Sequence, residues 1–142
     1  MNFSIIIPVF DRPDELEELL QSIVDQGSVN KPEVVVVEDG SALLSAKVVK
    51  KFEGVLNIKY LAKENSGPGL SRNFGMNWAN GDYFIILDSD CLLSAHYLDE
   101  VSKSLEVRYT DAFGGPDAAH PSFTLIQKAI SYAMTSFLST GG

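Results

Sequence analysis

The chain has 142 residues, of which 45% are hydrophobic and 21% are charged, a composition typical of one globular domain with a sizeable core. Its formal net charge is −8 at pH 7, and no basic stripe is present to displace counterions from a phosphate backbone. The composition therefore excludes nucleic acid as a bulk partner and leaves open a nucleotide that is held through a metal ion.

The single cysteine, Cys91, allows no internal disulfide and fits a reducing compartment. No basic segment followed by an apolar run precedes the first predicted strand, and no apolar run reaches membrane-spanning length. We therefore expect a cytoplasmic protein.

The first half of the chain predicts two strands and two helices. Residues 3–9 form a β-branched run, and this strand should end near Pro8 because proline cannot donate to a central ladder. Pro13 suits the first turn of a helix. The apolar residues of that helix recur at helical spacing: Leu16, Leu19, Leu20, Ile23 and Val24. Residues 33–38 predict a second buried strand, and a second helical face follows at Leu43, Leu44, Val48, Val49 and Phe52.

The middle of the chain predicts an edge strand, a helix and a buried strand. Residues 57–62 are more polar and suit the edge of a sheet. Residues 69–79 predict a helix with Leu70, Phe74 and Trp78 on one face. Residues 83–87 are apolar or aromatic, as is typical of a buried parallel strand, and they lead directly into Asp88-Ser89-Asp90.

Two helices and a strand are predicted after the paired aspartates. Ser94 precedes a helix that carries Leu98, Val101 and Leu105. Residues 111–115 predict a fifth strand, followed either by a plain turn or by a ligand-facing loop. Residues 122–138 predict a last helix that is apolar on more than one side, so most of its surface should be buried.

The alternation of elements predicts an α/β fold with a mostly parallel sheet, in the order 3-2-1-4 plus the fifth strand, and helices on both faces. Ligands of such sheets bind outside the carboxyl ends, where the chain direction reverses. Asp11, Asp39, Asp88 and Asp90 follow three of the strands and should meet there. Gathered like charges favour a divalent cation that also holds a diphosphate. The alternative at each position is a solvated loop or a helix cap.

The segment from Gly67 to Arg72 begins like a dinucleotide-binding G-x-G-x-x-G fingerprint. Its sixth position is an arginine and it follows the third strand, which argues against a dinucleotide site. A glycine-rich entry to a helix still favours contact between Arg72 and an anion or a diphosphate. A solvent-exposed arginine after an ordinary turn is the alternative.

Four motifs in this order resemble family 2 glycosyltransferases of the GT-A fold, over about the first two-thirds of the chain. They are Ser4-Ile5-Ile6-Ile7-Pro8-Val9-Phe10, Val36-Val37-Glu38-Asp39-Gly40-Ser41, Gly67-Pro68-Gly69-Leu70-Ser71-Arg72-Asn73-Phe74-Gly75 and Asp88-Ser89-Asp90. The resemblance implies transfer of a sugar from a nucleotide diphosphate donor, usually a UDP-sugar, to an acceptor hydroxyl with inversion.

The resemblance also implies roles for particular residues. The loop at Pro8, Val9 and Phe10 and the carboxylate of Asp39 would contact the base. Arg72 would lie near the base or the diphosphate. Asp88 would lie by the ribose and the donor sugar, and Asp90, with Asp88, would bind Mn²⁺ or Mg²⁺ on the diphosphate. The implied donor site is completed by Asp11, Gly67 and Ser89.

One departure from the family concerns the catalytic base, a carboxylate well downstream of the Asp-x-Asp motif. No position here matches it, because the chain ends too soon. We therefore expect residues 1–142 to be one donor-binding domain of a longer enzyme, truncated before its acceptor half. The acceptor would be a glycan or a lipid-linked glycan at the inner face of the membrane, by family analogy alone. The apolar helix at 123–138 would pack against a second copy of the chain.

Two other functions remain open. A non-catalytic module that keeps the nucleotide-sugar pocket would bind a donor without turnover. A sugar-nucleotide nucleotidyltransferase would need a loop rich in glycine and arginine directly after the first strand. The segment Phe10-Asp11-Arg12-Pro13 at that place is not such a loop.

Overall fold

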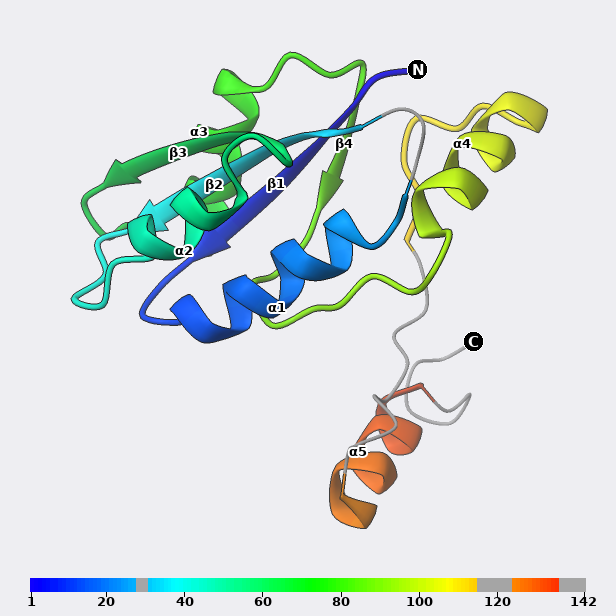
Figure 1. The fold of residues 1–142 in the computed structure, drawn as a ribbon. Helices are drawn as coiled ribbons and strands as arrows, with labels where there is room; N and C mark the ends of the chain where they lie inside the picture. Colours follow the sequence, from blue (N-terminus) through cyan, green and yellow to red (C-terminus); the bar gives the residue numbers. More distant parts are fainter. Residues whose placement is uncertain (28–30, 115–123, 136–142) are drawn as a thin grey trace. The chain divides into compact units, whose positions relative to one another are not determined.

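The computed structural model describes residues 1–27, 31–114 and 124–135. The chain divides into two compact units, Met1–Val107 and Arg108–Gly142. The first unit contains the sheet and four helices, and the described part of the second contains one helix (Figure 1). Each unit is considered by itself.

The sheet has four parallel strands in the order β3-β2-β1-β4, which confirms the predicted order (Figure 1). The strands are β1 (Phe3–Val9), β2 (Glu33–Asp39), β3 (Asn57–Lys63) and β4 (Tyr83–Ile86). Because all four run in one direction, their carboxyl ends share one edge of the sheet, the carboxyl edge, and their amino ends share the opposite amino edge. Every residue of β1 and β2 is buried, as expected for parallel strands covered on both faces.

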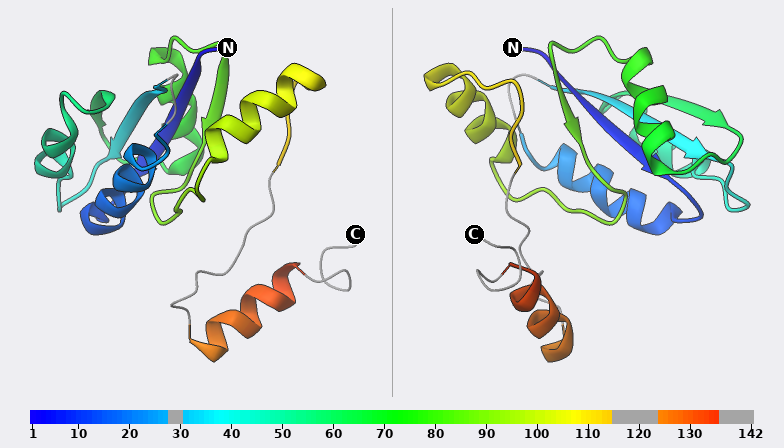
Figure 2. Two further views of the ribbon diagram at one scale, coloured as in Figure 1. Left: turned by 45° about the vertical axis from the view of Figure 1, so that its right-hand side comes forward. Right: turned by 180° about the vertical axis from the view of Figure 1, so that it is seen from behind.

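Helices cover both faces of the sheet, as predicted (Figure 2). On one face, apolar side chains of α1 (Pro13–Val24), α2 (Ala46–Phe52) and α4 (Tyr97–Val107) join one core with alternate residues of β1 and β2. On the other face, α3 (Pro68–Trp78) packs on the remaining alternate residues, Ile6, Val35 and Val37. The two cores therefore follow from the period-two alternation of strand side chains.

The predicted apolar face of the third helix is confirmed only at Phe74, which packs partly buried against Ile6, Val35 and Val37. Leu70 and Trp78 are 59% and 53% exposed, and the side of α3 that meets the sheet carries Ser71 and Gly75. A Cβ at Gly75 would lie 2.7 Å from Ile6 Cγ2 and 3.0 Å from Val37 Cγ2. The helix thus packs closely on the strands at Gly75, while its large apolar residues Phe74 and Met76 reach the same core only partly buried.

Three further sequence predictions differ from the structure. The strand predicted to be buried at residues 83–87 is the edge strand β4, in which Phe84 and Ile86 are 38% and 46% exposed. Leu43 and Leu44 are 62% and 60% exposed, because α2 begins only at Ala46 and these leucines belong to the preceding loop. Residues 111–114 form no strand, and Gly115, the last residue of the predicted fifth strand, lies outside the described residues. The sheet of the described residues therefore ends at four strands.

The second unit contains α5 (Leu125–Thr135), within the predicted last helix. Residues 122, 123 and 136–138 of that prediction lie outside the described residues. Its exposed side chains include Leu125, Ile126, Ile130 and Tyr132. The proposed packing of this helix against a second copy stays a prediction. Among the described residues, no helix is both long and apolar enough to cross a bilayer.

Glu33 joins three strands at the amino edge. Its carboxylate accepts hydrogen bonds from Ser4 Oγ at 2.6 Å and from the Asn80 N–H at 2.7 Å, and it lies 2.7 Å from Lys59 Nζ. Burial alone would raise the pKa of Glu33, but the hydrogen bonds from Lys59, Ser4 and Asn80 outweigh it and lower the pKa from 4.5 to about 2. Glu33 is therefore charged in the folded protein well into the acidic range.

Replacement of Gly75 by alanine should destabilise the protein. Overpacking costs roughly 1–3 kcal/mol, and the gain in helix propensity offsets only about 1 kcal/mol of it. The matched control is Gly69→Ala in the same helix, where an added Cβ meets nothing within 4 Å, so the free energy of unfolding should stay equal or rise. Urea denaturation measures both. Equal effects of the two variants would contradict the close packing.

Acid should remove the contribution of Glu33 to stability. Its folded pKa lies below its unfolded value, so this stability is complete above pH 4.5 and is lost as pH falls toward 2. The loss is on the order of 3 kcal/mol over that window. Denaturant unfolding of the wild type and of Glu33→Gln at several pH values tests this. The wild type should lose stability more steeply, whereas parallel curves would refute the assignment.

Candidate functional site

Four segments meet at the carboxyl edge, and hydrogen bonds or ion pairs join each to the next. The loop after β1 contacts the loop after β2 through the Asp11 N–H, which donates to Ser41 Oγ at 2.9 Å. It also contacts the loop after β4, because Arg12 Nη1 lies 3.0 Å from Asp90 Oδ2. The structure thus brings the predicted acidic tips together, as the topology requires.

Asp11 connects the first two tips in both directions. It donates its N–H to Ser41, and its Oδ1 accepts the Leu43 N–H at 2.8 Å. Its backbone has φ 53°, in the left-handed region that aspartate tolerates better than most residues. Phe10 beside it is 50% exposed and presents an aromatic ring at this edge. Pro8 and Val9, by contrast, are buried within β1, so their side chains belong to the core.

Asp39 connects the second tip with the entry to α3. Its carboxylate is buried and accepts the N–H groups of Ser66 and Gly67 at 2.9 Å each, and it forms an ion pair with Lys63. Burial alone would raise the pKa of Asp39, but the hydrogen bond from Lys63, followed by those from Ser66 and Ser71, lowers it below 3.8. The charged carboxylate therefore holds residues 63–67 in place.

The backbone conformation and the close contacts at Gly40 explain why a glycine follows Asp39. Its φ is 72°, and a Cβ there would lie 2.5 Å from the backbone nitrogen of Asn65. The Asn65 side chain in turn donates to the Asp39 carbonyl at 2.9 Å. The two loops are thus in direct contact over the end of β2.

The fourth tip carries the two aspartates of the Asp-x-Asp motif. Their side chains are more than half exposed, and each is paired with an arginine, Asp88 with Arg72 and Asp90 with Arg12. Ser89 between them is buried. Arg72 also has a buried Nε with no hydrogen-bond partner among the described residues. Exposed ion pairs contribute little to stability, so these guanidinium and carboxylate groups are available to a ligand at low cost.

The carboxylates offer the hard oxygen ligands that Mg²⁺ and Mn²⁺ prefer. Within the described ranges, no group of three or more histidine, cysteine, aspartate or glutamate side chains is arranged to hold a metal by itself. A cation that binds one or two carboxylates and completes its shell on a substrate diphosphate fits this donor set. The residues present therefore fit a shared metal and not a closed protein site.

Sequence reasoning missed several residues of this edge: Arg12, Ser41, Lys63, Asn65 and Ser66. Arg12 and Lys63 could not be assigned from the sequence, because their partners Asp90 and Asp39 lie 78 and 24 residues away. Ser41 ends the motif Val36-Val37-Glu38-Asp39-Gly40-Ser41, and this membership was the one sequence signal of its role. Gly67, which was predicted, enters the site through its N–H on Asp39.

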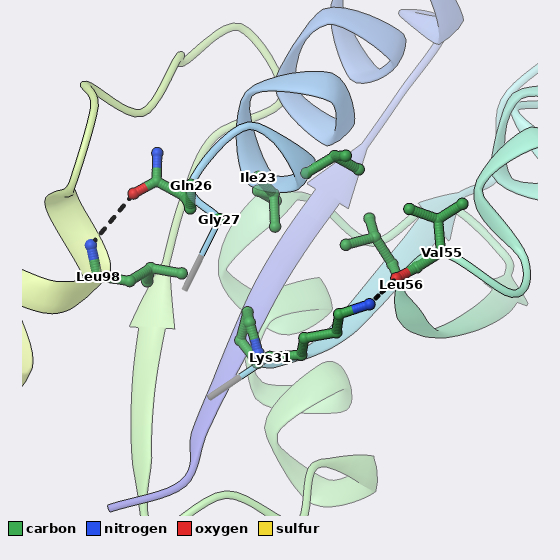
Figure 3. A pocket seen from close by; sticks show the side chains of 9 residues that line it. Ile23, Gln26, Gly27, Lys31, Val55, Leu56 and Leu98 are labelled. Carbon is green, nitrogen blue, oxygen red and sulfur yellow. Dashed lines mark hydrogen bonds between the residues drawn. The ribbon is translucent and has the colours of Figure 1, made fainter. Parts of the chain in front are cut away.

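A cavity of about 150 Å³ lies elsewhere, between the end of α1, the start of α4 and the segments that enter β2 and β3 (Figure 3). Ile23, Gln26, Lys31, Leu56 and Leu98 are among its lining residues. Gln26 accepts the Leu98 N–H, and Lys31 donates to the Val55 carbonyl. The polar groups drawn there are thus used within the protein, and the cavity is at the amino edge, away from the acidic tips.

Comparisons with known proteins give a consistent result. The family described as Glycosyl transferase family 2 matches residues 4–140. The poly(ribitol-phosphate) beta-N-acetylglucosaminyltransferase TarS of Staphylococcus aureus is 28% identical over 152 aligned positions, which cover 95% of this chain and 26% of TarS. The chain thus spans about a quarter of this relative's length.

Solved structures match at the level of the fold and of the sequence. The crystal structure of TarS 1–349 with UDP-GlcNAc superimposes with a TM-score of 0.73 at 28% identity, over 82% of this chain and 37% of that one. A mannosyltransferase from Pyrobaculum calidifontis in complex with GDP-Man and Mn²⁺ has a TM-score of 0.68 at 26% identity, over 73% of this chain and 32% of that one.

Replacement of Asp39 by alanine should loosen the entry to α3. It leaves two N–H groups and the Lys63 ammonium without their buried acceptor, which costs about 3 kcal/mol or more. Urea unfolding measures the loss, and limited proteolysis should show new cleavage at residues 63–67. The control Asp25→Ala, at an exposed position, should change stability by no more than about 0.5 kcal/mol. An Asp39 variant as stable as this control would contradict the assignment.

Proposed function

Because the chain belongs to glycosyltransferase family 2 and shares the GT-A fold of its solved relatives, we propose that its carboxyl edge binds a nucleotide diphosphate sugar and that the whole enzyme transfers the sugar with inversion. The observation that carries the proposal is the meeting of four segments at one edge, with an exposed aromatic ring, two exposed carboxylates and two arginines. UDP-sugar is the proposed donor, since a relative's structure contains UDP-GlcNAc.

The proposed roles follow from the chemistry of each group. The exposed ring of Phe10 offers a stacking surface for the base, next to Asp11 and to the loop that Asp39 holds. Asp39 is proposed to contact the nucleobase. Its buried carboxylate also holds residues 63–67 in place beside that contact. Pro8 and Val9 are proposed to contribute backbone groups only, because their side chains are buried.

The diphosphate is proposed to lie between Arg72 and the aspartates. Arg72 sits in the first turns of α3, and its guanidinium supplies charge-assisted hydrogen bonds that suit phosphate oxygens. Asp90, with Asp88, would hold Mn²⁺ or Mg²⁺, and Ser89 and Gly67 would contribute through their backbone. When bound, such a cation neutralises the charge that develops on the leaving diphosphate.

The acceptor and the catalytic base belong to the rest of the proposed enzyme. TarS is named for transfer to poly(ribitol-phosphate), and we extend only the class of a glycan or lipid-linked glycan acceptor to this chain. A cytoplasmic location at the inner face of the membrane is part of the proposal, and the single cysteine agrees with a reducing compartment. Because this chain spans about a quarter of TarS, we propose that the catalytic base lies in a part of the whole enzyme that this chain does not include.

Calorimetric titration of UDP with and without Mn²⁺ tests the donor site. The wild type should bind UDP more tightly with Mn²⁺, and Asp90→Ala should lose this dependence and at least about tenfold in affinity. The matched control is Asp82→Ala, an exposed carboxylate at the amino end of β4, which should bind like the wild type. Failure of the wild type to bind UDP with Mn²⁺, or unchanged metal dependence in Asp90→Ala, would refute the proposal.

A further inference from the structure

Glu38, the residue before Asp39, is a buried carboxylate with no assigned role. It is 1% exposed. Its oxygens accept the Ser41 hydroxyl, the Ser45 N–H at 2.7 Å and the Tyr60 hydroxyl at 2.9 Å. Among the described residues, none of the ion pairs includes Glu38. It therefore depends on neutral donors alone.

A buried carboxylate without a cation is unfavourable unless hydrogen bonds replace its hydration. Here the donors come from three places: the loop after β2, the start of α2 and the middle of β3. Burial, followed by the hydrogen bond and the negative charge of Glu38, raises the pKa of Tyr60, so this hydroxyl stays a donor. Glu38 thus fixes residues 41–45 to the sheet.

The network continues beyond this loop to the proposed base pocket. Ser41 donates its hydroxyl to Glu38 and accepts the Asp11 N–H at 2.9 Å, and Asp11 Oδ1 accepts the Leu43 N–H. The positions of the exposed Phe10 ring and of Asp11 therefore depend on a loop that is hydrogen-bonded to the buried Glu38. Arg72 and Asp88 form an ion pair with each other, outside this network as far as the described residues show.

We propose that Glu38 is a positioning residue for the base end of the donor site. This role rests on the proposed function of the carboxyl edge. Glu38 acts through Ser41 and Tyr60 to preorganise the loop that binds the nucleoside. It reaches the diphosphate end only through the exposed pair of Arg12 with Asp90, so its effect there should be small. Its loss should weaken ligands that carry a base and leave ligands made of phosphate alone almost unchanged.

The chain supplies a matched control on the same strand. Glu33 is also a buried carboxylate of β2, and it also accepts several hydrogen bonds, but it lies at the amino edge. Glu33→Gln and Glu38→Gln make the same chemical change at opposite ends of β2. A general loosening of the sheet would affect both variants alike, whereas a positioning role separates them.

The test measures dissociation constants of UDP and of inorganic pyrophosphate, each with Mn²⁺, at a temperature where thermal melts show every variant folded. Glu38→Gln should weaken UDP about tenfold or more and change pyrophosphate less than about twofold. Glu33→Gln should leave both constants within about twofold. Tyr60→Phe, which keeps the carboxylate and removes one donor, should weaken UDP by a smaller factor in the same direction and serves if Glu38→Gln does not fold.

Three results would overturn the inference. UDP affinity unchanged in Glu38→Gln, or in Tyr60→Phe where that variant stands in for it, would remove the positioning role. An equal loss for UDP and pyrophosphate would place the effect on the whole site. An equal loss in Glu33→Gln would show a general structural effect. Failure of the wild type to bind UDP would instead refute the proposed function itself. If the wild type binds UDP, the variants test the role of Glu38 alone.

Discussion

Two adjacent buried carboxylates at the end of β2 organise the carboxyl edge. Successive strand side chains point to opposite faces, so Glu38 and Asp39 reach the loops on the two sides of the sheet. Glu38 holds residues 41–45, which lead into α2, and Asp39 holds residues 63–67, which lead into α3. Because both carboxylates are buried, each must be satisfied by specific donors, and this requirement fixes the loops more firmly than exposed contacts would.

The proposed site combines these firmly held loops with exposed charged groups that a ligand can engage. The carboxylates of Glu38 and Asp39 beneath the loops are buried, whereas Arg12–Asp90 and part of Arg72–Asp88 face solvent. Exposed pairs contribute little to folding, so a diphosphate and a cation can take over these groups without loss of the fold. The division suits a donor site, in which the nucleoside end needs a preformed surface and the diphosphate end needs charge.

The sheet order and α1 could be predicted from the sequence, because short alternating elements and the spacing of Leu16, Leu19, Leu20 and Ile23 are local signals. The buried side of α3 could not, since it depends on the close approach of Gly75 to Ile6. The meeting of the acidic tips followed from topology. The hydrogen-bond partners of Glu38 and Asp39 could not be predicted from the topology, because some of them lie up to 28 residues away along the sequence.

The most direct test of a single nucleotide site at the carboxyl edge is the mapping of backbone amide NMR shifts on addition of UDP and Mg²⁺. The account predicts that the perturbed amides cluster in four segments: residues 10–12, 39–45, 65–72 and 88–90. Shifts confined to the cavity at the amino edge, around Ile23, Gly27 and Leu98, would contradict it, as would a spectrum that does not change.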